Sequence, residues 1–332
     1  MKNDNISSLR KIMGTVPKIN VKLETPFFEG VRDIKVELFD YPVNPYLAIF
    51  NMATSTWGNR INKWDDTSTE GRLWVIKSVL EFKSLPNAME SISFTFGVEN
   101  CSRSAFDQIA RSRIGAVYSS MGWRDNDHSD IGFRVPQSIW NNLEERERFI
   151  SLCLLAKEYY HGLVKSGKSN WQDARAYLPI SACHNFSMAM NYMALRNFMG
   201  KRLKFCEMAD TVAVAWLMRE RVMEKYPLLG SYLRPSCDWK GKCEYHQNNM
   251  MSEAFGCLLK ECGRNVCLAS DNYAIFNYAC SDRDVIQEQL GMKIPLADED
   301  MPVDGYDDLL PSDKLLFEVE SQFHSKLLGN NR

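Results

Sequence analysis

Five polar side chains in two separated segments have the types and spacing expected of an anion-binding site. Gln108 and Arg111 are three residues apart and share one face of a helix, whereas Arg113 points elsewhere. Arg175 lies between two alanines, and Arg202 ends an apolar stretch. A buried arginine is costly unless an acid or an anionic ligand neutralises it. Several such arginines in one chain favour phosphate recognition over the alternative, a solvated basic surface.

The stretch 92–124 is expected to position the first three of these residues. Its opening alternation predicts a half-buried strand, over Ile92, Phe94, Phe96 and Val98. A turn at 100–102 follows, and Ser102 or Ser104 is the expected N-cap of a short basic helix. The loop from Gly115 to Gly122, which contains Ser120, then offers backbone amides and ends at Trp123-Arg124. A rigid strand, a basic helix and free amides together suit an anionic ligand.

The other candidate residues fall in segments with helical patterns. Phe186 to Arg202 is predicted as one apolar helix, in which Asn191 and Asn197 lie on different sides unless Asn191 precedes the first turn. Each asparagine is more often a hydrogen-bonded core residue than a ligand contact. The longest helical pattern runs from Ser138 to Leu163. Asn44-Pro45 starts an earlier helix, because proline is favoured in the first turn.

Composition and charge describe an ordinary globular chain. With 332 residues, 45% hydrophobic and 25% charged, it is long enough for one large domain or two smaller ones. The formal net charge of −2 gives no overall case for nucleic-acid binding, so any anion site must be a local arginine cluster. The N-terminal residues contain no apolar run typical of a secretory signal, and no stretch reaches the length of a membrane span. We therefore expect a cytoplasmic protein.

The ten cysteines are concentrated near the C-terminus. Six lie between Cys237 and Cys280, where the composition also shifts to Gly, Asn and Pro. We place a domain boundary there, with a catalytic domain at 1–235 and a cysteine-rich extension at 236–332. The Cys237–Cys243 and Cys257–Cys262 spacings are looser than those of usual zinc sites, so buried thiols are favoured over a metal site.

One alternative assigns the chemistry to a cysteine. Cys183-His184 is similar to the nucleophile segment of the folate-only thymidylate synthases, in which a thiolate attacks C6 of a pyrimidine. The segments that follow that cysteine in those enzymes have no counterpart here, so a small residue before a core segment is the favoured interpretation. The chain also lacks the glycine patterns of Rossmann and P-loop nucleotide sites.

Three segments together resemble the flavin-dependent thymidylate synthases, the ThyX family. NPYLAIFNMATSTWG at 44–58 resembles the N-terminal helix and turn of that family, and 92–124 resembles its strand, basic helix and signature loop. DARAYLP with MNYMALRNFMGKR, within 173–202, resembles its second ligand-binding block. The resemblance covers about residues 40–235. It implies an α/β fold with a twisted, mainly antiparallel sheet flanked by long helices, assembled as a homotetramer with active sites between subunits.

The resemblance also implies the reaction and its cofactors. One carbon passes from methylenetetrahydrofolate to C5 of dUMP, reduced FAD supplies a hydride, and NADPH reduces the flavin. The flavin carries the difficult step, so no protein nucleophile is needed. The protein orients the nucleotide and the flavin, with Arg111 and Arg202 as the residues that complement charge at the reacting ring.

Site residues are implied position by position. The implied nucleotide ligands are Gln108, Arg111, Ser120, Arg124, Arg175 and Arg202, where matching Arg124 requires one inserted residue. The implied flavin contacts are Ser55, Asn87, Glu90, Arg111, Ser112, Arg113, Asn191 and Asn197. No metal site is implied.

Several positions depart from the family pattern. Ser112 replaces a histidine, and the acidic residue and serine of the signature loop are replaced within Tyr118–Met121. Two further histidines of the family correspond to Leu85 and Cys206. The nucleotide side is thus retained, while groups that place protons and contact the flavin or folate are altered. The default activity is thymidylate synthesis; a C5-hydroxymethylase of dCMP or dUMP and a non-catalytic nucleotide- or flavin-binding protein are the alternatives.

Overall fold

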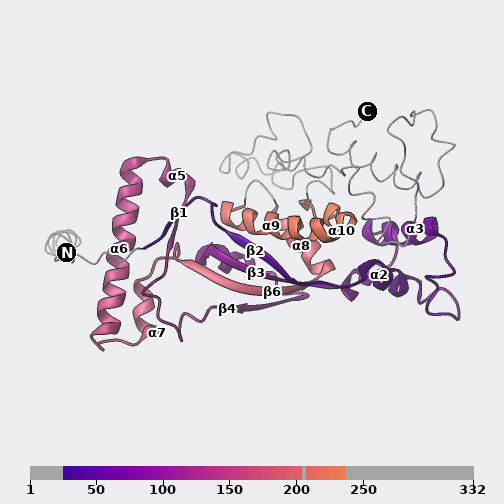
Figure 1. The fold of residues 1–332 in the computed structure, drawn as a ribbon, viewed down its shortest axis with the longest axis horizontal. Coiled ribbons are helices and arrows are strands. Elements are labelled where there is room, and N and C mark those ends of the chain that lie inside the picture. Colours follow the sequence, from indigo (N-terminus) through magenta and orange to yellow (C-terminus); the bar gives the residue numbers. More distant parts are fainter. Residues whose placement is uncertain (1–24, 204–206, 237–332) are drawn as a thin grey trace, which may run out of the picture.

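The computed structural model describes residues 25–203 and 207–236. They form a four-stranded antiparallel sheet in the order β2-β3-β6-β4 and a two-stranded parallel ribbon, β1-β5. Figure 1 shows α8, α9 and α10 along one side of the sheet, with α2 and α3 at one end of the molecule and α6 and α7 at the other. The predicted α/β class, a mainly antiparallel sheet flanked by helices, is confirmed. The six cysteines of the predicted extension lie outside the described residues.

The elements have the following bounds. The strands are β1 Phe27–Glu29, β2 Lys35–Asp40, β3 Ser93–Ser102, β4 Ala116–Ser120, β5 Phe133–Val135 and β6 Cys183–Asn191. The helices are α2 Pro45–Thr54, α3 Thr69–Leu80, α4 Arg103–Ile109, α5 Gln137–Trp140, α6 Leu143–Lys165, α7 Trp171–Ala174, α8 Tyr192–Arg202, α9 Ala209–Lys225 and α10 Pro227–Ser231. Two short 3-10 helices complete them, η1 Pro86–Ser91 and η2 Arg175–Tyr177.

The sheet separates a packed face from an open face. Along β3 and β6 every second side chain is apolar and buried against the helices, namely Phe94, Phe96, Val98, Phe186, Met188 and Met190. The intervening residues lie on the opposite face, where Phe39 of β2 is 58% exposed and Val117 of β4 is 71% exposed. One face of this sheet therefore forms the core, and the other carries polar residues with a few exposed apolar ones.

Several elements begin where their sequence predicts. Asn44 caps α2 by accepting a hydrogen bond from the Leu47 amide at 3.0 Å, and Pro45 occupies the first turn. Ser102 ends β3 and caps α4 by accepting from the Ala105 amide at 3.2 Å. Both caps depend on side chains that reach backbone groups three residues away, which is why the local sequence predicts them.

The predicted loop from Gly115 to Gly122 is wrong, because most of it is strand β4. Ala116 to Ser120 pair with β6 in antiparallel register. The preceding helix is also shorter than predicted, so that Arg111 and Arg113 lie beyond its end rather than on it. Tyr118 of β4 packs against this end of α4, because its hydroxyl lies within donating distance of the Ile109 carbonyl, at 3.0 Å, and of the Ser112 carbonyl, at 2.8 Å.

The predicted apolar helix from Phe186 to Arg202 is two elements. Its first half is strand β6, the partner of both β3 and β4, and Asn191 ends that strand and caps α8 by accepting from the Ala194 amide at 2.8 Å. A strand buried on one face and bearing small residues on the other cannot be distinguished from a helix by apolar content alone. The predicted helix from Ser138 to Leu163 is likewise divided, because Asn142 caps a new helix, α6.

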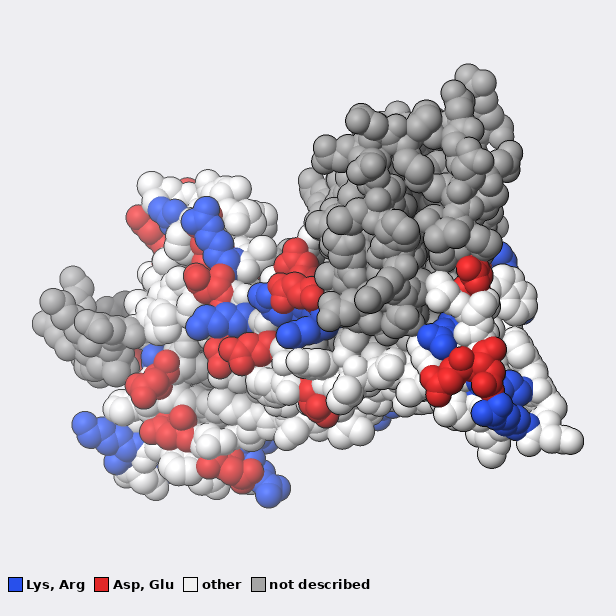
Figure 2. Space-filling model, turned by 45° about the vertical axis from the view of Figure 1, so that its right-hand side comes forward, with Lys and Arg blue, Asp and Glu red and all other residues white. Residues whose placement is uncertain are grey.

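Surface charge is mixed, in line with the low net charge. On the face shown in Figure 2, acidic and basic side chains alternate without a broad field of either sign. Within 25–203 and 207–236, no helix combines the length and hydropathy that a membrane span requires. In the same residues no group of three or more His, Cys, Asp or Glu side chains is arranged to hold a metal ion.

Candidate functional site

An arginine-lined pocket lies where β4 ends, where α4 begins and where η2 passes. It has a volume of ≈ 470 Å³ and is lined by Arg103, Ser120, Met121, Gly122, Trp123, Arg124, Arg175 and Ala176. No carboxylate is among these residues. The pocket brings together three of the predicted nucleotide ligands, Ser120, Arg124 and Arg175. We call it the anion pocket.

Backbone hydrogen bonds to one segment, 180–185, hold the walls of the anion pocket. The Arg103 amide donates to the Ala182 carbonyl at 2.9 Å, and the Met121 amide donates to the Asn185 carbonyl at 3.0 Å. Gly122 is fixed in a turn by the Asn126 side chain, which donates to its carbonyl at 2.7 Å. These bonds place α4, the 121–124 segment and the chain after η2 at fixed positions relative to one another.

The charges of the anion pocket differ in how they are balanced. Arg175 is half-buried and forms no ion pair or side-chain hydrogen bond with any residue in the described part of the chain. Arg124 is paired with Asp125 at 3.3 Å, but both side chains are mostly exposed, so water screens that pair. A partly desolvated, unpaired guanidinium attracts an anionic ligand strongly.

A second cluster of predicted residues lies around Arg202, at the end of α8. Arg202 forms an ion pair with Glu207 at 2.7 Å and donates to the Gln108 carbonyl at 2.6 Å. Of the two partners expected for a buried arginine, an acid or an anionic ligand, the described chain supplies an acid, Glu207. The Nε of Arg202 nevertheless remains buried without a partner among the described residues.

Arg111, Ser112 and Arg113 form an exposed turn beside the start of α8. Neither arginine side chain has an ion pair or hydrogen bond within the described residues. Gly115 closes the turn with a φ of +67°, and a Cβ there would lie 2.6 Å from Nδ2 of Asn191. The turn therefore carries two exposed guanidinium groups without partners among the described residues, and its last residue, Gly115, lies against the Asn191 side chain.

The length of β4 separates the turn from the anion pocket. The turn precedes Ala116 and the pocket begins at Ser120, so the two lie at opposite ends of a strand of about 13 Å at the usual rise per residue. Ser55 ends α2, and Asn87 and Glu90 are exposed on η1, which packs on α2 and α8 rather than on α6. Asn197 is exposed on α8. The described chain therefore does not gather all the predicted residues in one cavity.

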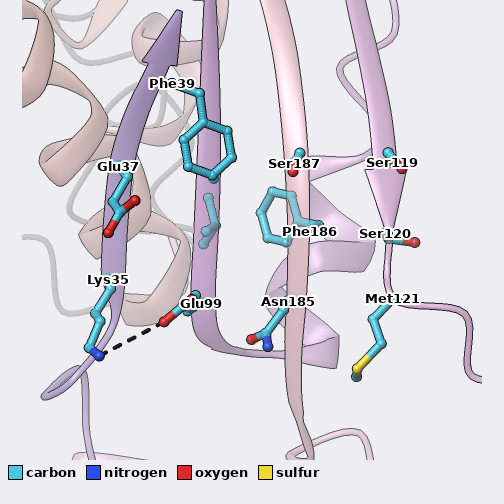
Figure 3. A pocket seen from close by; sticks show the side chains of 12 residues that line it. Lys35, Glu37, Phe39, Glu99, Ser119, Ser120, Met121, Asn185, Phe186 and Ser187 are labelled. Atoms are coloured by element: carbon cyan, nitrogen blue, oxygen red, sulfur yellow. Dashed lines mark ion pairs between the residues drawn. The ribbon is translucent and has the colours of Figure 1, made fainter. Parts of the chain in front are cut away.

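A second hollow, of ≈ 380 Å³, lies on the open face of the sheet and shares Ser120 and Met121 with the anion pocket. Figure 3 shows Phe39 lying across β3, with Ser187 and Ser119 on the neighbouring strands. Phe39 covers Gly97, where a Cβ would come within 2.0 Å of its ring. Lys35 is paired with Glu99 at 3.8 Å, and Glu37 adds a further carboxylate. These acids make the hollow a poorer place for an anion than the arginine-lined pocket.

Comparison with known proteins identifies the family. Residues 37–228 match the family model described as "Thymidylate synthase complementing protein". The chain is 29% identical over 245 residues to the flavin-dependent thymidylate synthase of Pyrococcus furiosus, a match that covers 68% of this chain and 94% of that protein. It is 30% identical over 220 residues to the same enzyme of Pyrococcus horikoshii, covering 62% and 84%.

The chain belongs to the flavin-dependent thymidylate synthase family. Among solved structures, a UMP/dUMP methylase, PolB from Streptomyces cacaoi, bound with 5-Br dUMP, shares the fold with a TM-score of 0.54 and 18% identity, covering 62% of this chain and 95% of that one. The predicted resemblance and the predicted type of enzyme, a flavin-dependent transferase, are confirmed. The identities near 30% agree with a divergent member of the family.

The structure disfavours the alternative in which Cys183 is a nucleophile. Cys183 is a buried residue of β6, and burial raises the pKa of its thiol to about 12. The neighbouring His184 is fully buried, and burial lowers the pKa of its imidazole to about 4, so it carries no charge at pH 7. A neutral thiol beside a neutral imidazole has little nucleophilic thiolate.

We therefore predict that Cys183→Ala retains transferase activity within about threefold, because the residue contributes packing and not chemistry. Turnover of dUMP with FAD, folate and NADPH would measure this, with Cys153→Ala, another buried thiol, as the matched control. A selective loss of more than about 100-fold in Cys183→Ala, with an unchanged melting temperature, is the scale of losing a nucleophile and would restore that alternative.

Sequence reasoning missed two residues of the anion pocket, Arg103 and Trp123, as site candidates. Arg103 follows a serine in a strand-to-helix turn and has no obvious motif around it. It joins the pocket only because the chain at 180–182 passes beside the start of α4. The corresponding signal in the sequence would be a cation at the first position of a helix that follows a strand, and that signal is too general to use alone.

Proposed function

We propose that this protein transfers a one-carbon unit from methylenetetrahydrofolate to C5 of a pyrimidine deoxynucleoside monophosphate, with dUMP to dTMP as the default reaction. The observation that carries the proposal is the anion pocket with its half-buried, unpaired Arg175. A phosphate monoester suits this pocket, because planar guanidinium groups bind phosphate oxygens through pairs of hydrogen bonds.

Each part of the nucleotide has candidate ligands. Ser120, Arg124 and Arg175 hold the phosphate in this proposal. Gln108, Arg111 and Arg202 face the pyrimidine, where the arginines stabilise negative charge that develops on the ring during transfer. The buried, unpartnered Nε of Arg202 is a donor available for such a contact.

The residues around the 111–113 turn fit a flavin. FAD carries a diphosphate, and the turn carries two exposed arginines without partners among the described residues, while Gly115 at its end lies against the Asn191 side chain. When bound, FAD would supply the hydride chemistry of the reaction, with NADPH as its reductant. Ser55, Asn87, Glu90, Ser112 and Asn197 are the further flavin contacts in the proposal. The protein's own part is to hold the flavin against the pyrimidine and to exclude water.

We also propose a homotetramer with active sites between subunits. The separation of the two clusters by the length of β4 supports this, because a second copy of the chain supplies the missing half of each site. The exposed residues of the open sheet face, such as Phe39 and Val117, are available for such contacts.

A C5-hydroxymethylase of dCMP or dUMP is the second candidate. The departures at Ser112 and within Tyr118–Met121 favour it. Burial raises the pKa of Tyr118 to about 12, and its hydroxyl is engaged by two backbone carbonyls. Tyr118 therefore cannot replace the acidic group of the family loop as a proton acceptor. In the hydroxymethylase, water rather than hydride ends the reaction.

Product mass separates these candidates. Purified protein with FAD, methylenetetrahydrofolate and NADPH is incubated with dUMP or dCMP, and we expect a gain of about 14 Da for methylation or about 30 Da for hydroxymethylation, from the atoms added at C5. The absorbance of the purified protein shows whether flavin is bound, and addition of NADPH should bleach that absorbance. Colourless protein that gains no thermal stability from FAD, and yields neither product, would instead identify a binding protein without turnover.

A further inference from the structure

Arg103 is the third arginine of the anion pocket and has a different setting from the other two. Its guanidinium lies over the ring of Phe106 at 5.1 Å and over the ring of Trp123 at 5.6 Å. The side chain is 31% exposed and pairs with Asp107 at 3.1 Å, which is not among the residues lining the pocket. Two aromatic faces restrict the rotamers of Arg103 while leaving part of the guanidinium open to the pocket.

Trp123 is itself fixed by His184. The indole nitrogen of Trp123 lies 3.0 Å from Nδ1 of His184, and because an indole can only donate, Nδ1 must be the acceptor. The other ring nitrogen, Nε2, therefore carries the proton and lies 3.5 Å from the Arg103 guanidinium. His184 is fully buried. It thus holds Trp123 in place without adding a fourth positive charge to the pocket.

The positions of all three arginines are linked through the backbone. Beyond the bond from the Arg103 amide to Ala182, the Ser104 amide donates to the Ile180 carbonyl at 3.0 Å, three residues after η2. Arg103 is thereby fixed relative to Arg175, and Trp123 fixes the segment that ends in Arg124. Ligands held by preorganised groups lose less affinity to the ordering of side chains.

The charges on the lining residues match a phosphate in its dianionic form. Three guanidinium groups and no carboxylate line the pocket, and the acids paired with Arg103 and Arg124 lie outside it. A phosphate monoester carries −1.5 to about −2 charges at neutral pH and offers three acceptor oxygens. Each of the three guanidinium groups can therefore donate hydrogen bonds to a different phosphate oxygen.

We propose that Arg103 is a phosphate-binding residue of this site, held in position by Phe106 and by the Trp123–His184 hydrogen bond. The proposal rests on the proposed function, because it assigns the anion to the phosphate of the nucleotide substrate. Arg103 then distinguishes a nucleoside monophosphate from the corresponding nucleoside, and Trp123 is a positioning residue that acts through it.

Arg103→Gln tests the assignment, because glutamine keeps an aliphatic stem between the two rings and removes the charge. We expect the Kd for dUMP and for inorganic phosphate to rise roughly 10- to 100-fold, as for loss of a charged hydrogen bond, with deoxyuridine binding unchanged. Arg103→Lys should lose less affinity for dUMP and phosphate, since lysine keeps the positive charge but not the planar guanidinium that donates paired hydrogen bonds. Titration calorimetry on the full chain measures the Kd for dUMP, inorganic phosphate and deoxyuridine.

Two further variants separate binding from a structural role. Asp107→Asn removes the ion-pair partner of Arg103 and should leave dUMP affinity unchanged or higher, because more of the charge is available to the ligand. Trp123→Phe retains a ring but not the donor to His184, and should weaken dUMP binding by about fivefold, the value of one hydrogen bond, without affecting deoxyuridine. A merely structural Arg103 would lower the melting temperature equally in Arg103→Gln and Asp107→Asn, with no change in dUMP affinity.

The outcomes distinguish this proposal from the proposed function. If Arg103→Gln binds dUMP and phosphate as tightly as the unmodified protein, the assignment of Arg103 is overturned and the proposed function stands. If the unmodified protein binds phosphate but not dUMP, the proposed function fails, and the loss of phosphate binding in Arg103→Gln still supports the anion site. If the unmodified protein binds neither ligand, both proposals fail.

Discussion

Replacing Arg175 by alanine should weaken dUMP binding roughly 10- to 150-fold, the range that corresponds to losing about 1.5–3 kcal/mol of charge-assisted hydrogen bonding. Arg175 is half-buried in the anion pocket and has no ion pair in the described chain, so its charge is free to act on a ligand. The same substitution should not destabilise the fold, since it breaks no pair there. Calorimetric titration with dUMP and thermal unfolding measure the two effects separately.

Arg148→Ala is the matched control for this experiment. Arg148 is exposed on α6 and pairs with Glu144 and with Glu145, outside the anion pocket. Its loss should leave dUMP affinity unchanged and cost at most about 1 kcal/mol, as for other exposed pairs. Equal dUMP affinity in Arg175→Ala and Arg148→Ala would show that the phosphate binds elsewhere.

Arg134→Met should destabilise the fold by about 3–5 kcal/mol, the cost of breaking a buried charged network. Arg134 of β5 is 2% exposed and donates to three carbonyls, those of Asn100, of Gly30 at 2.5 Å and of Arg32 at 2.7 Å. The hydrogen bonds of Arg134 therefore connect the β1-β5 ribbon to the end of β3. Methionine fills much of the volume but leaves all three carbonyls without this donor.

Urea unfolding of the full chain measures this loss. Arg32→Ala serves as the control, because Arg32 is 72% exposed and pairs with Glu29 on the surface, so a change within about 0.5 kcal/mol is expected. A cost below about 1 kcal/mol for Arg134→Met would mean that water replaces the lost donor. The ribbon would then be held mainly by packing, for example by the stacked rings of Phe27 and Phe133.

Several features predicted from local interactions are confirmed. The alternation in β3, the caps at Asn44 and Ser102 and the proline at the start of α2 all involve residues within four positions of one another. Family membership could also be predicted, because the ligand-binding segments keep their order along the chain. The assignment of single side chains to nucleotide or flavin remains a prediction.

Other features depended on contacts that span the chain. The stretch 116–120 has only a weak alternation of apolar and polar residues, and it forms strand β4 by pairing with 186–190. Arg202 has the sequence context of a ligand-binding arginine, and the structure pairs it with Glu207, a partner that the sequence pattern does not predict. The apolar content of 186–202 predicts that the segment is buried, but it does not predict that half of the segment is a strand.

The arginines show most clearly where the sequence stops being informative. Their number, in a chain of net charge −2, indicated a local anion site. Only the tertiary structure decided which of them share a pocket, because Arg103, Arg124 and Arg175 are brought together by hydrogen bonds to 180–185. It also decided that Arg134 serves the fold, since its three carbonyl partners come from distant segments. Charge and burial can be estimated from a sequence, whereas the partner of a buried charge depends on chain segments that meet only after folding.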